Sequence, residues 1–202
     1  LSRPVGLLLW GYLFWLLTSL QLLHNDLAGQ LVAFGLVLVL DLLALRGGQT
    51  KELWAWRKAN RRLILTTETL FLVAFGIWAV VRAANPAIIG TEKPMEMAFI
   101  NAILRSPTFP PNDPWLSGYA ISYYYFGYVL AAMLIRVSAV DASIGYNLMS
   151  ALWFALTALG AYGVLFDLLA GDRHKEGKIS GWVYAASLLA PFMLLIVSNW
   201  HG

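Results

Sequence analysis

A polar stretch within a mostly apolar chain carries the residues whose types and spacing suit chemistry best. Glu92 and Glu96 lie four residues apart, a spacing that turns two side chains toward the same face of a helix. Pro94 between them suits the first turn of a helix, where its missing N–H group costs nothing. Two carboxylates at the positive end of a helix dipole could hold a divalent metal ion or act as a general base. Ordinary helix-terminal electrostatics explain the same spacing, so both interpretations stay open at this point.

Three further polar residues follow the two glutamates and are candidates for ligand contact. Arg105 could pair with a phosphate group, or its side chain could extend to the lipid headgroups. Asn112 and Asp113 precede Pro114, a pattern typical of a turn. For these two residues a turn is therefore one interpretation, and contact with a ligand is the other.

Three consecutive tyrosines, Tyr123, Tyr124 and Tyr125, lie near the start of an apolar segment at residues 121–137. In a helix, three successive side chains spread around nearly a full turn. Aromatic side chains often anchor helices at the membrane interface. Since three in a row cannot all anchor the same face, we expect at least one of them to face the protein or a pocket.

The composition places these residues in an integral membrane protein. The chain is 59% hydrophobic and only 12% charged, whereas soluble domains are about 45–50% apolar and about 25% charged. It has no cysteine, which excludes disulfides and thiolate metal sites. The net charge of +3 is small, and we expect no nucleic-acid partner. Both ends of the sequence look cut, so we interpret residues 1–202 as one membrane domain of a longer chain, with the remainder of that chain as a partner.

Five segments are long and apolar enough to cross a bilayer as helices, which takes about 20 apolar residues each. Backbone groups within lipid must be satisfied inside their own segment, and long apolar runs achieve this as helices. The predicted fold class is therefore all-α, a polytopic transmembrane bundle with additional external surface helices. The predicted spans are residues 4–23, 27–45, 63–84, 144–170 and 179–198.

The distribution of basic residues predicts the topology of this bundle. Residues 46–62 hold six basic side chains and one acidic side chain, and residues 171–178 are also basic. The positive-inside rule places both segments in the cytoplasm, which leaves residues 85–143 external. This arrangement requires that residues 121–137 do not cross. We therefore expect that segment to be a helix in the outer interface, although a full crossing, with 171–178 outside, is the alternative.

Residues 91–106, 109–115 and 122–127 resemble the YYY membrane protein family of bacteria and archaea, long known only as a domain of unknown function. That family is similar in turn to the GT-C superfamily of membrane glycosyltransferases, which use polyprenyl-phosphate sugars. By that pattern Glu92 matches the key acid of the first external loop, and Glu96 is its helical neighbour. A second acid usually follows a later span. His201 stands at that place here, and histidine can also bind a metal.

The resemblance implies a GT-C-like glycosyltransferase that acts at the outer membrane face on a polyprenyl-phosphate sugar or another lipid-linked ligand. Glu92 and Glu96 would be its catalytic residues, and Glu92 with His201 would hold a divalent ion (Mg, Mn or Zn). The substrate-binding set would be Arg105, Asn112, Asp113, Tyr123, Tyr124 and Tyr125. Two alternatives remain, namely a non-catalytic membrane subunit and a module that binds or transports the lipid-linked ligand. In each case membrane lipid surrounds the protein.

Overall fold

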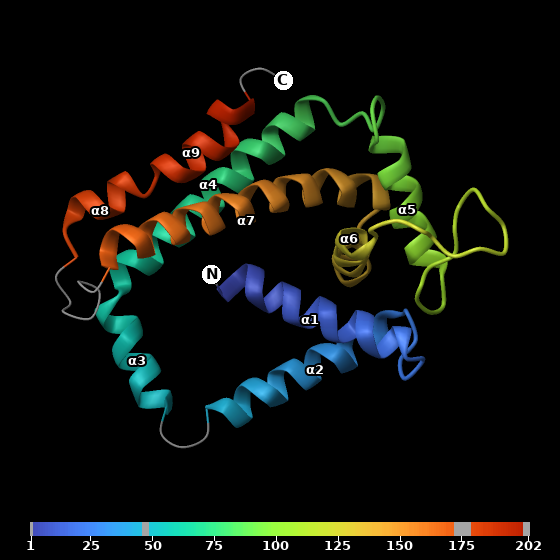
Figure 1. Ribbon diagram of the computed structural model, residues 1–202, viewed down its shortest axis with the longest axis horizontal. Coiled ribbons are helices and arrows are strands. Elements are labelled where there is room, and N and C mark those ends of the chain that lie inside the picture. Colours follow the sequence, from blue (N-terminus) through green and yellow to red (C-terminus); the bar gives the residue numbers. More distant parts are fainter. Residues whose placement is uncertain (1, 46–48, 172–178, 200–202) are drawn as a thin grey trace.

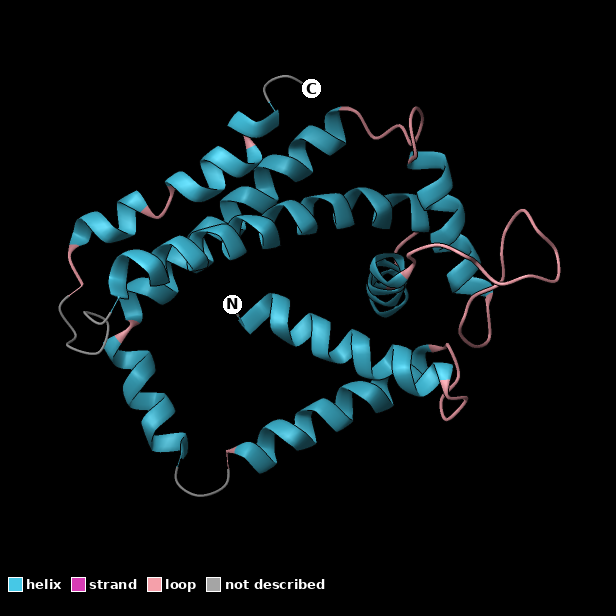
Figure 2. Ribbon diagram, in the orientation of Figure 1, coloured by secondary structure: helices cyan, strands magenta, loops and turns pink. Residues whose placement is uncertain are grey.

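A computed structural model describes residues 2–45, 49–171 and 179–199, and within these ranges the regular elements are helices (Figure 2). One isolated β-bridge joins Asn112 to Ala120. In chain order the helices are α1 (Ser2–Ser19), α2 (Leu27–Ala44), α3 (Gln49–Ala59), α4 (Arg61–Ala84), α5 (Lys93–Arg105), α6 (Phe126–Ser138), α7 (Ala142–Ala170), α8 (Gly181–Ala186) and α9 (Leu189–Leu195), followed by a 3₁₀ turn at Val197–Asn199. The predicted all-α class is confirmed for the described residues.

Three of the described helices, α2, α4 and α7, are long and apolar enough to cross a membrane. They match the predicted spans at residues 27–45, 63–84 and 144–170. The prediction for residues 4–23 is confirmed only as a helix, because α1 ends at Ser19 and is not among the three candidate spans.

The prediction of one continuous span at residues 179–198 is wrong. This segment is divided between α8 and α9, with a turn at Ser187 and Leu188. Pro191 lies four residues after Ser187 and has no N–H group to donate to the Ser187 carbonyl, so the helical hydrogen-bond ladder is interrupted there. Together the two pieces form a shorter apolar segment, Gly181–Leu195.

The antiparallel pair of α4 and α7 forms the spine of the molecule (Figure 1). Small buried side chains at Ala74, Ala155 and Ala158 let the two helices approach closely. Beyond them the Trp78 and Phe154 rings stack with centroids 4.5 Å apart. The Trp78 Nε1–H group donates a 3.0 Å hydrogen bond to Ser150 Oγ, so this half-buried indole nitrogen has a partner within the protein.

Helix α6 crosses the direction of the long helices and is seen end-on in Figure 1. Two glycines permit its close contact with the neighbouring helices α1 and α7. A Cβ atom at Gly11 would lie 2.0 Å from Leu130 Cδ2, and one at Gly145 would lie 2.3 Å from Ile135 Cγ1. With 13 residues, α6 is about 20 Å long and too short to cross a hydrocarbon core about 30 Å thick.

The helix predicted at residues 121–137 is corrected at its start, because α6 begins at Phe126 and the three tyrosines precede it. The chain before α6 is held by its own backbone contacts. The Ile121 N–H group donates to the Pro111 carbonyl at 2.9 Å, beside the bridge between Asn112 and Ala120. These contacts keep the tyrosine segment out of the helix.

The long helices define two ends of the molecule (Figure 1). Helix α3, the last turn of α7 and the start of α8 lie at one end, whereas α5 and the loops around it lie at the other. The end with α3 carries the basic residues 51–62, so the positive-inside rule makes it the cytoplasmic end. We call the opposite end, with α5, the external end. The arrangement agrees with the topology in which residues 121–137 do not cross.

Candidate functional site

A cavity of about 380 Å³ lies at the external end, where α5, α6 and α7 meet. Its walls are mainly apolar and aromatic, with a few polar groups, which is the usual composition of a small-molecule site. The lining residues are Glu96, Ile100, Tyr124, Gly127, Tyr128, Ala131, Tyr146, Met149, Ser150 and Trp153.

Glu96 is the only carboxylate among these lining residues. It lies in the first turn of α5, as its spacing from Pro94 predicts, and its side chain is half-buried. The Tyr146 hydroxyl of α7 donates a short hydrogen bond to Glu96 Oε2. The carboxylate is thus held toward the cavity by a residue that lies 50 positions further along the chain.

Glu92 occupies the N-cap position of α5 but makes no side-chain cap hydrogen bond there. It is exposed and does not line the cavity. Its negative charge nevertheless contributes to raising the pKa values of Tyr123 and Tyr128, so it lies within electrostatic reach of the rim. The two glutamates therefore share one end of α5, as predicted, while only Glu96 enters the cavity.

The three consecutive tyrosines separate into different environments. Tyr124 lines the cavity, and Tyr123 packs beside it with ring centroids 3.9 Å apart. The Tyr123 hydroxyl donates to the Tyr124 hydroxyl at 2.7 Å. Tyr125 turns into the bundle, where its hydroxyl accepts a 3.1 Å hydrogen bond from Trp15 Nε1. The prediction that at least one of them faces the protein or a pocket is confirmed.

Two tyrosines around the cavity remain neutral far above physiological pH. Burial, together with the charge of Glu96, raises the pKa of Tyr128 to about 12. The hydrogen bond to Tyr124, followed by burial, raises the pKa of Tyr123 to about 12 as well. Both hydroxyl groups therefore stay protonated at physiological pH, and the proton of Tyr123 remains in its hydrogen bond to Tyr124.

The structure does not bring Arg105, Asn112 or Asp113 to this cavity. Arg105 is exposed at the far end of α5, nine residues beyond Glu96 and hence about 14 Å along the helix axis. The Asp113 Oδ1 atom accepts the N–H groups of Trp115 and Leu116 at 2.8 and 2.9 Å, as a turn residue does. For Asn112 and Asp113 the structure thus favours the turn interpretation.

Within the described residues no group of three or more His, Asp or Glu side chains could hold a metal ion. His201, the second predicted metal ligand, lies outside the described residues. Glu92 alone does not make a metal site, so the predicted pairing with His201 stays a prediction.

Sequence reasoning missed the other polar and aromatic residues of the cavity, Tyr128, Tyr146, Ser150 and Trp153. Three of them lie on one face of α7, at positions 146, 150 and 153. This i, i+4, i+7 spacing was visible in the sequence as polar and aromatic side chains within an apolar run. Tyr128 follows Tyr124 by four residues. The sequence did not show that both line the same cavity, because that depends on where α6 begins.

A buried polar network fixes the position of α5. The side chain of Asn25, from the turn between α1 and α2, donates to the carbonyls of Ile103 and Ser106 at 2.6 and 2.7 Å. Its Oδ1 atom accepts a 3.0 Å hydrogen bond from Arg136 of α6. Arg136 also donates to the Leu104 carbonyl at 2.9 Å. The last carbonyls of α5, which have no partner within the helix, are satisfied in this way.

Comparison with known proteins gives one match. The family described as "Uncharacterized membrane protein (DUF2298)" matches residues 9–202. No curated protein and no solved structure matches the chain. The match agrees with the membrane class deduced from composition and brings no activity with it.

Proposed function

The chain belongs to the DUF2298 family of uncharacterized membrane proteins, and within that family we propose that it binds a lipid-linked sugar in the external cavity and transfers the sugar to a hydroxyl acceptor. The observation that carries the proposal is the Glu96 carboxylate, held by Tyr146 inside an aromatic-walled cavity. Residues 91–106, 109–115 and 122–127 resemble the YYY family, and the similarity of that family to polyprenyl-phosphate-sugar transferases favours the same class of substrate.

The cavity walls suit a sugar. The rings of Tyr124, Tyr128 and Trp153 present flat apolar faces against which the C–H groups of a sugar ring pack. Hydroxyl groups of the tyrosines and of Ser150 donate to and accept from sugar hydroxyls. Because the cavity lies at the end of the spanning helices, a polyprenyl chain would remain in the bilayer while its sugar occupies the cavity.

The reaction requires a group that accepts a proton. The acceptor oxygen forms a new bond to the anomeric carbon of the sugar, while the bond from that carbon to the phosphate oxygen breaks. The polyprenyl phosphate leaves with the bonding electrons, and the proton of the acceptor hydroxyl passes to a carboxylate. We assign this role to Glu96, with Tyr146 holding its carboxylate in position. Glu92, at the rim, is the alternative base that the resemblance favours.

A divalent ion could assist departure of the phosphate, but the described residues present no complete ligand set for one. Among the described residues that line the cavity there is also no lysine or arginine. The phosphate would therefore lie at the mouth of the cavity rather than inside it.

The test measures release of polyprenyl phosphate from polyprenyl-phosphate mannose and polyprenyl-phosphate glucose by the protein in proteoliposomes. Glu96→Gln should lower the rate by about 10²-fold or more, the usual contribution of a general base. Glu92→Gln should have a smaller effect. Glu52→Gln is the matched control, because Glu52 is exposed on α3 at the cytoplasmic end.

Two outcomes would contradict the assignment. If Glu96→Gln releases polyprenyl phosphate at the wild-type rate while Glu92→Gln does not, the base is Glu92. If the wild-type protein binds these donors but releases no polyprenyl phosphate, the cavity belongs to a non-catalytic binding module.

A further inference from the structure

A second cavity, of about 390 Å³, lies at the cytoplasmic end between α3, α4, α7 and the start of α1. It is separate from the external cavity, and none of its lining residues is shared with it. Its polar and interfacial side chains come from four different helices. They are Ser2, Trp56, Arg57, Thr67, Glu68, Tyr162 and Asp167.

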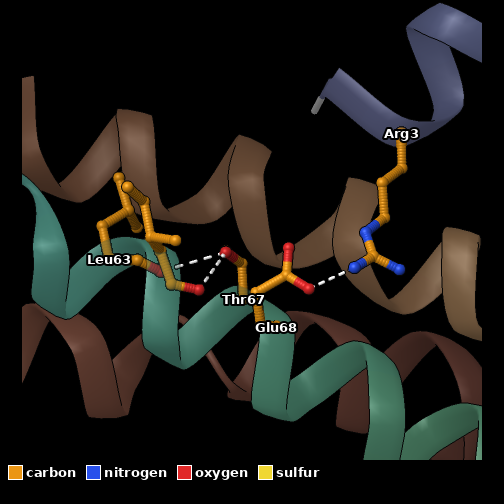
Figure 3. A network of polar contacts seen from close by, with 5 residues as sticks. Arg3, Leu63, Thr67 and Glu68 are labelled. Atoms are coloured by element: carbon orange, nitrogen blue, oxygen red, sulfur yellow. Dashed lines mark hydrogen bonds and ion pairs between the residues drawn. The ribbon is translucent and has the colours of Figure 1, made fainter. Parts of the chain in front are cut away.

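The charged side chains that line this cavity are one cation, Arg57, and two anions, Glu68 and Asp167. Glu68 forms an ion pair with Arg3, whose side chain reaches across from α1 (Figure 3). This leaves Arg57 of α3 and Asp167 of α7 as one positive and one negative group, both exposed. A ligand that carries a single charge would satisfy only one of them. A ligand with a separate anionic and cationic group would satisfy both.

One polar group in the wall lacks a partner. Tyr162 is fully buried, and its hydroxyl has no hydrogen-bond partner. Leaving a buried hydroxyl unpaired costs about 1–3 kcal/mol, so native structures seldom do it without a reason. The nearby Thr67 hydroxyl differs, because it donates to the carbonyls of Leu63 and Ile64 (Figure 3). Tyr162 is thus a buried wall residue whose hydroxyl is unpaired.

The depth of the cavity matches the boundary between lipid headgroups and hydrocarbon. Glu68 lies seven residues into α4, about 10 Å from its start, and Asp167 lies three residues, or about 5 Å, before the end of α7. Trp56 on α3 is of the type that concentrates at this interface. An occupant therefore has its polar part among these charges and its apolar part in the bilayer.

We propose that the cytoplasmic cavity binds the headgroup of phosphatidylethanolamine, a phospholipid with one phosphate and one primary ammonium group. Arg57 pairs with the phosphate, Asp167 accepts hydrogen bonds from the ammonium group, and the Tyr162 hydroxyl gains its missing partner. The bound lipid joins α3, whose described side chains from Thr50 to Lys58 are exposed, to the spine of α4 and α7.

The test uses the protein purified from a bilayer that contains equal amounts of phosphatidylethanolamine, phosphatidylglycerol and phosphatidylcholine, with retained lipids counted by native mass spectrometry. Phosphatidylethanolamine should be retained over the other two lipids. Arg57→Gln and Asp167→Asn should each weaken that retention by roughly tenfold. The matched controls are Arg105→Gln and Asp141→Asn, exposed residues beside the external end, and these should retain the lipid as the wild type does.

A second measurement covers variants that fold poorly. The rise in thermal midpoint on adding phosphatidylethanolamine to delipidated protein should shrink in Tyr162→Phe relative to wild type. Equal retention of phosphatidylglycerol would overturn the proposal. It would show that basic side chains bind any phosphate headgroup and that the ammonium group is not recognised. Equal loss of lipid in the variants and the controls would overturn it too. Sugar transfer is not measured here, so failure leaves the proposal for the external cavity unchanged.

Discussion

At the external end of α7, Tyr146 faces a cavity walled by α5 and α6, whereas near the cytoplasmic end Tyr162 borders one walled by α3 and α4. The two volumes are nearly equal, at about 380 and 390 Å³. Their polar groups differ. Tyr146 donates to a carboxylate, while the Tyr162 hydroxyl has no partner. The external cavity therefore holds its carboxylate in place through a contact within the protein, whereas the buried hydroxyl beside the cytoplasmic cavity has no such contact.

The walls of the two cavities also differ in how firmly they are held. Helix α5 is tied at its far end through Asn25 and Arg136, and its Phe99 and Ile103 side chains are buried. The described side chains of α3 from Thr50 to Lys58 are exposed, so little packing fixes it. A site for chemistry needs a rigid shell around its reacting groups, whereas a lipid can supply part of its own site. Cavity size alone would not have distinguished the two.

The largest effect is expected in the buried polar network of Asn25 and Arg136 that holds α5 in position. Asn25→Ala removes the donors to two buried carbonyls and the acceptor of Arg136, so it should destabilise the protein by about 3 kcal/mol. Thermal unfolding in detergent would show the loss. Asn60→Ala is the control, because Asn60 makes only an exposed bond to the Trp56 carbonyl. Equal loss of stability in both variants would show that the external wall is no better held than the cytoplasmic one.

A smaller effect is expected when the tyrosine at the external cavity loses its hydroxyl. Tyr146→Phe removes a hydrogen bond to a charged group, so the release of polyprenyl phosphate should fall by roughly tenfold while the fold is retained. Tyr119→Phe, at an exposed loop position, is the matched control. If Tyr146→Phe leaves the rate unchanged, Tyr146 does not position Glu96 for the reaction.

The ion pair between Arg3 and Glu68 should contribute less. Both side chains are about two-fifths exposed, at 42% and 44%, and exposed pairs typically contribute below about 1 kcal/mol. A double-mutant cycle with Arg3→Gln and Glu68→Gln should give a coupling energy in that range. A coupling of several kcal/mol would mean that the cytoplasmic end is held as tightly as the external end.

The smallest effect concerns pH. Tyr123 and Tyr128 have pKa values of about 12 in the folded protein, against an ordinary value of 10.0. Their contribution to stability is therefore complete below pH 10 and is lost as the pH rises toward 12. Tyrosinate absorbance should show Tyr123 and Tyr128 among the groups that titrate late, and Tyr123→Phe should remove one late group. Titration of both residues near pH 10 would contradict the tight packing around the external cavity.

The sequence alone was enough for features that depend on local composition. Hydropathy identified the spans that became α2, α4 and α7, because burial in lipid imposes a long apolar run wherever it occurs. Pro94 and Glu96 indicated the start of α5, because the rules for the first turn of a helix involve neighbouring residues only. The break between α8 and α9 was not predicted, although Pro191 just after it lacks the N–H group that a continuous helix needs.

Only the tertiary structure decided which of the two glutamates enters a cavity. The spacing of Glu92 and Glu96 placed both on one face, but it could not show that Tyr146, 50 residues away, donates to Glu96 alone. It likewise could not show that Asn25 joins the ends of α5 and α6 across 81 and 111 residues. Helix propensity and hydropathy are properties of neighbouring residues, whereas these contacts arise from how the finished helices pack against one another.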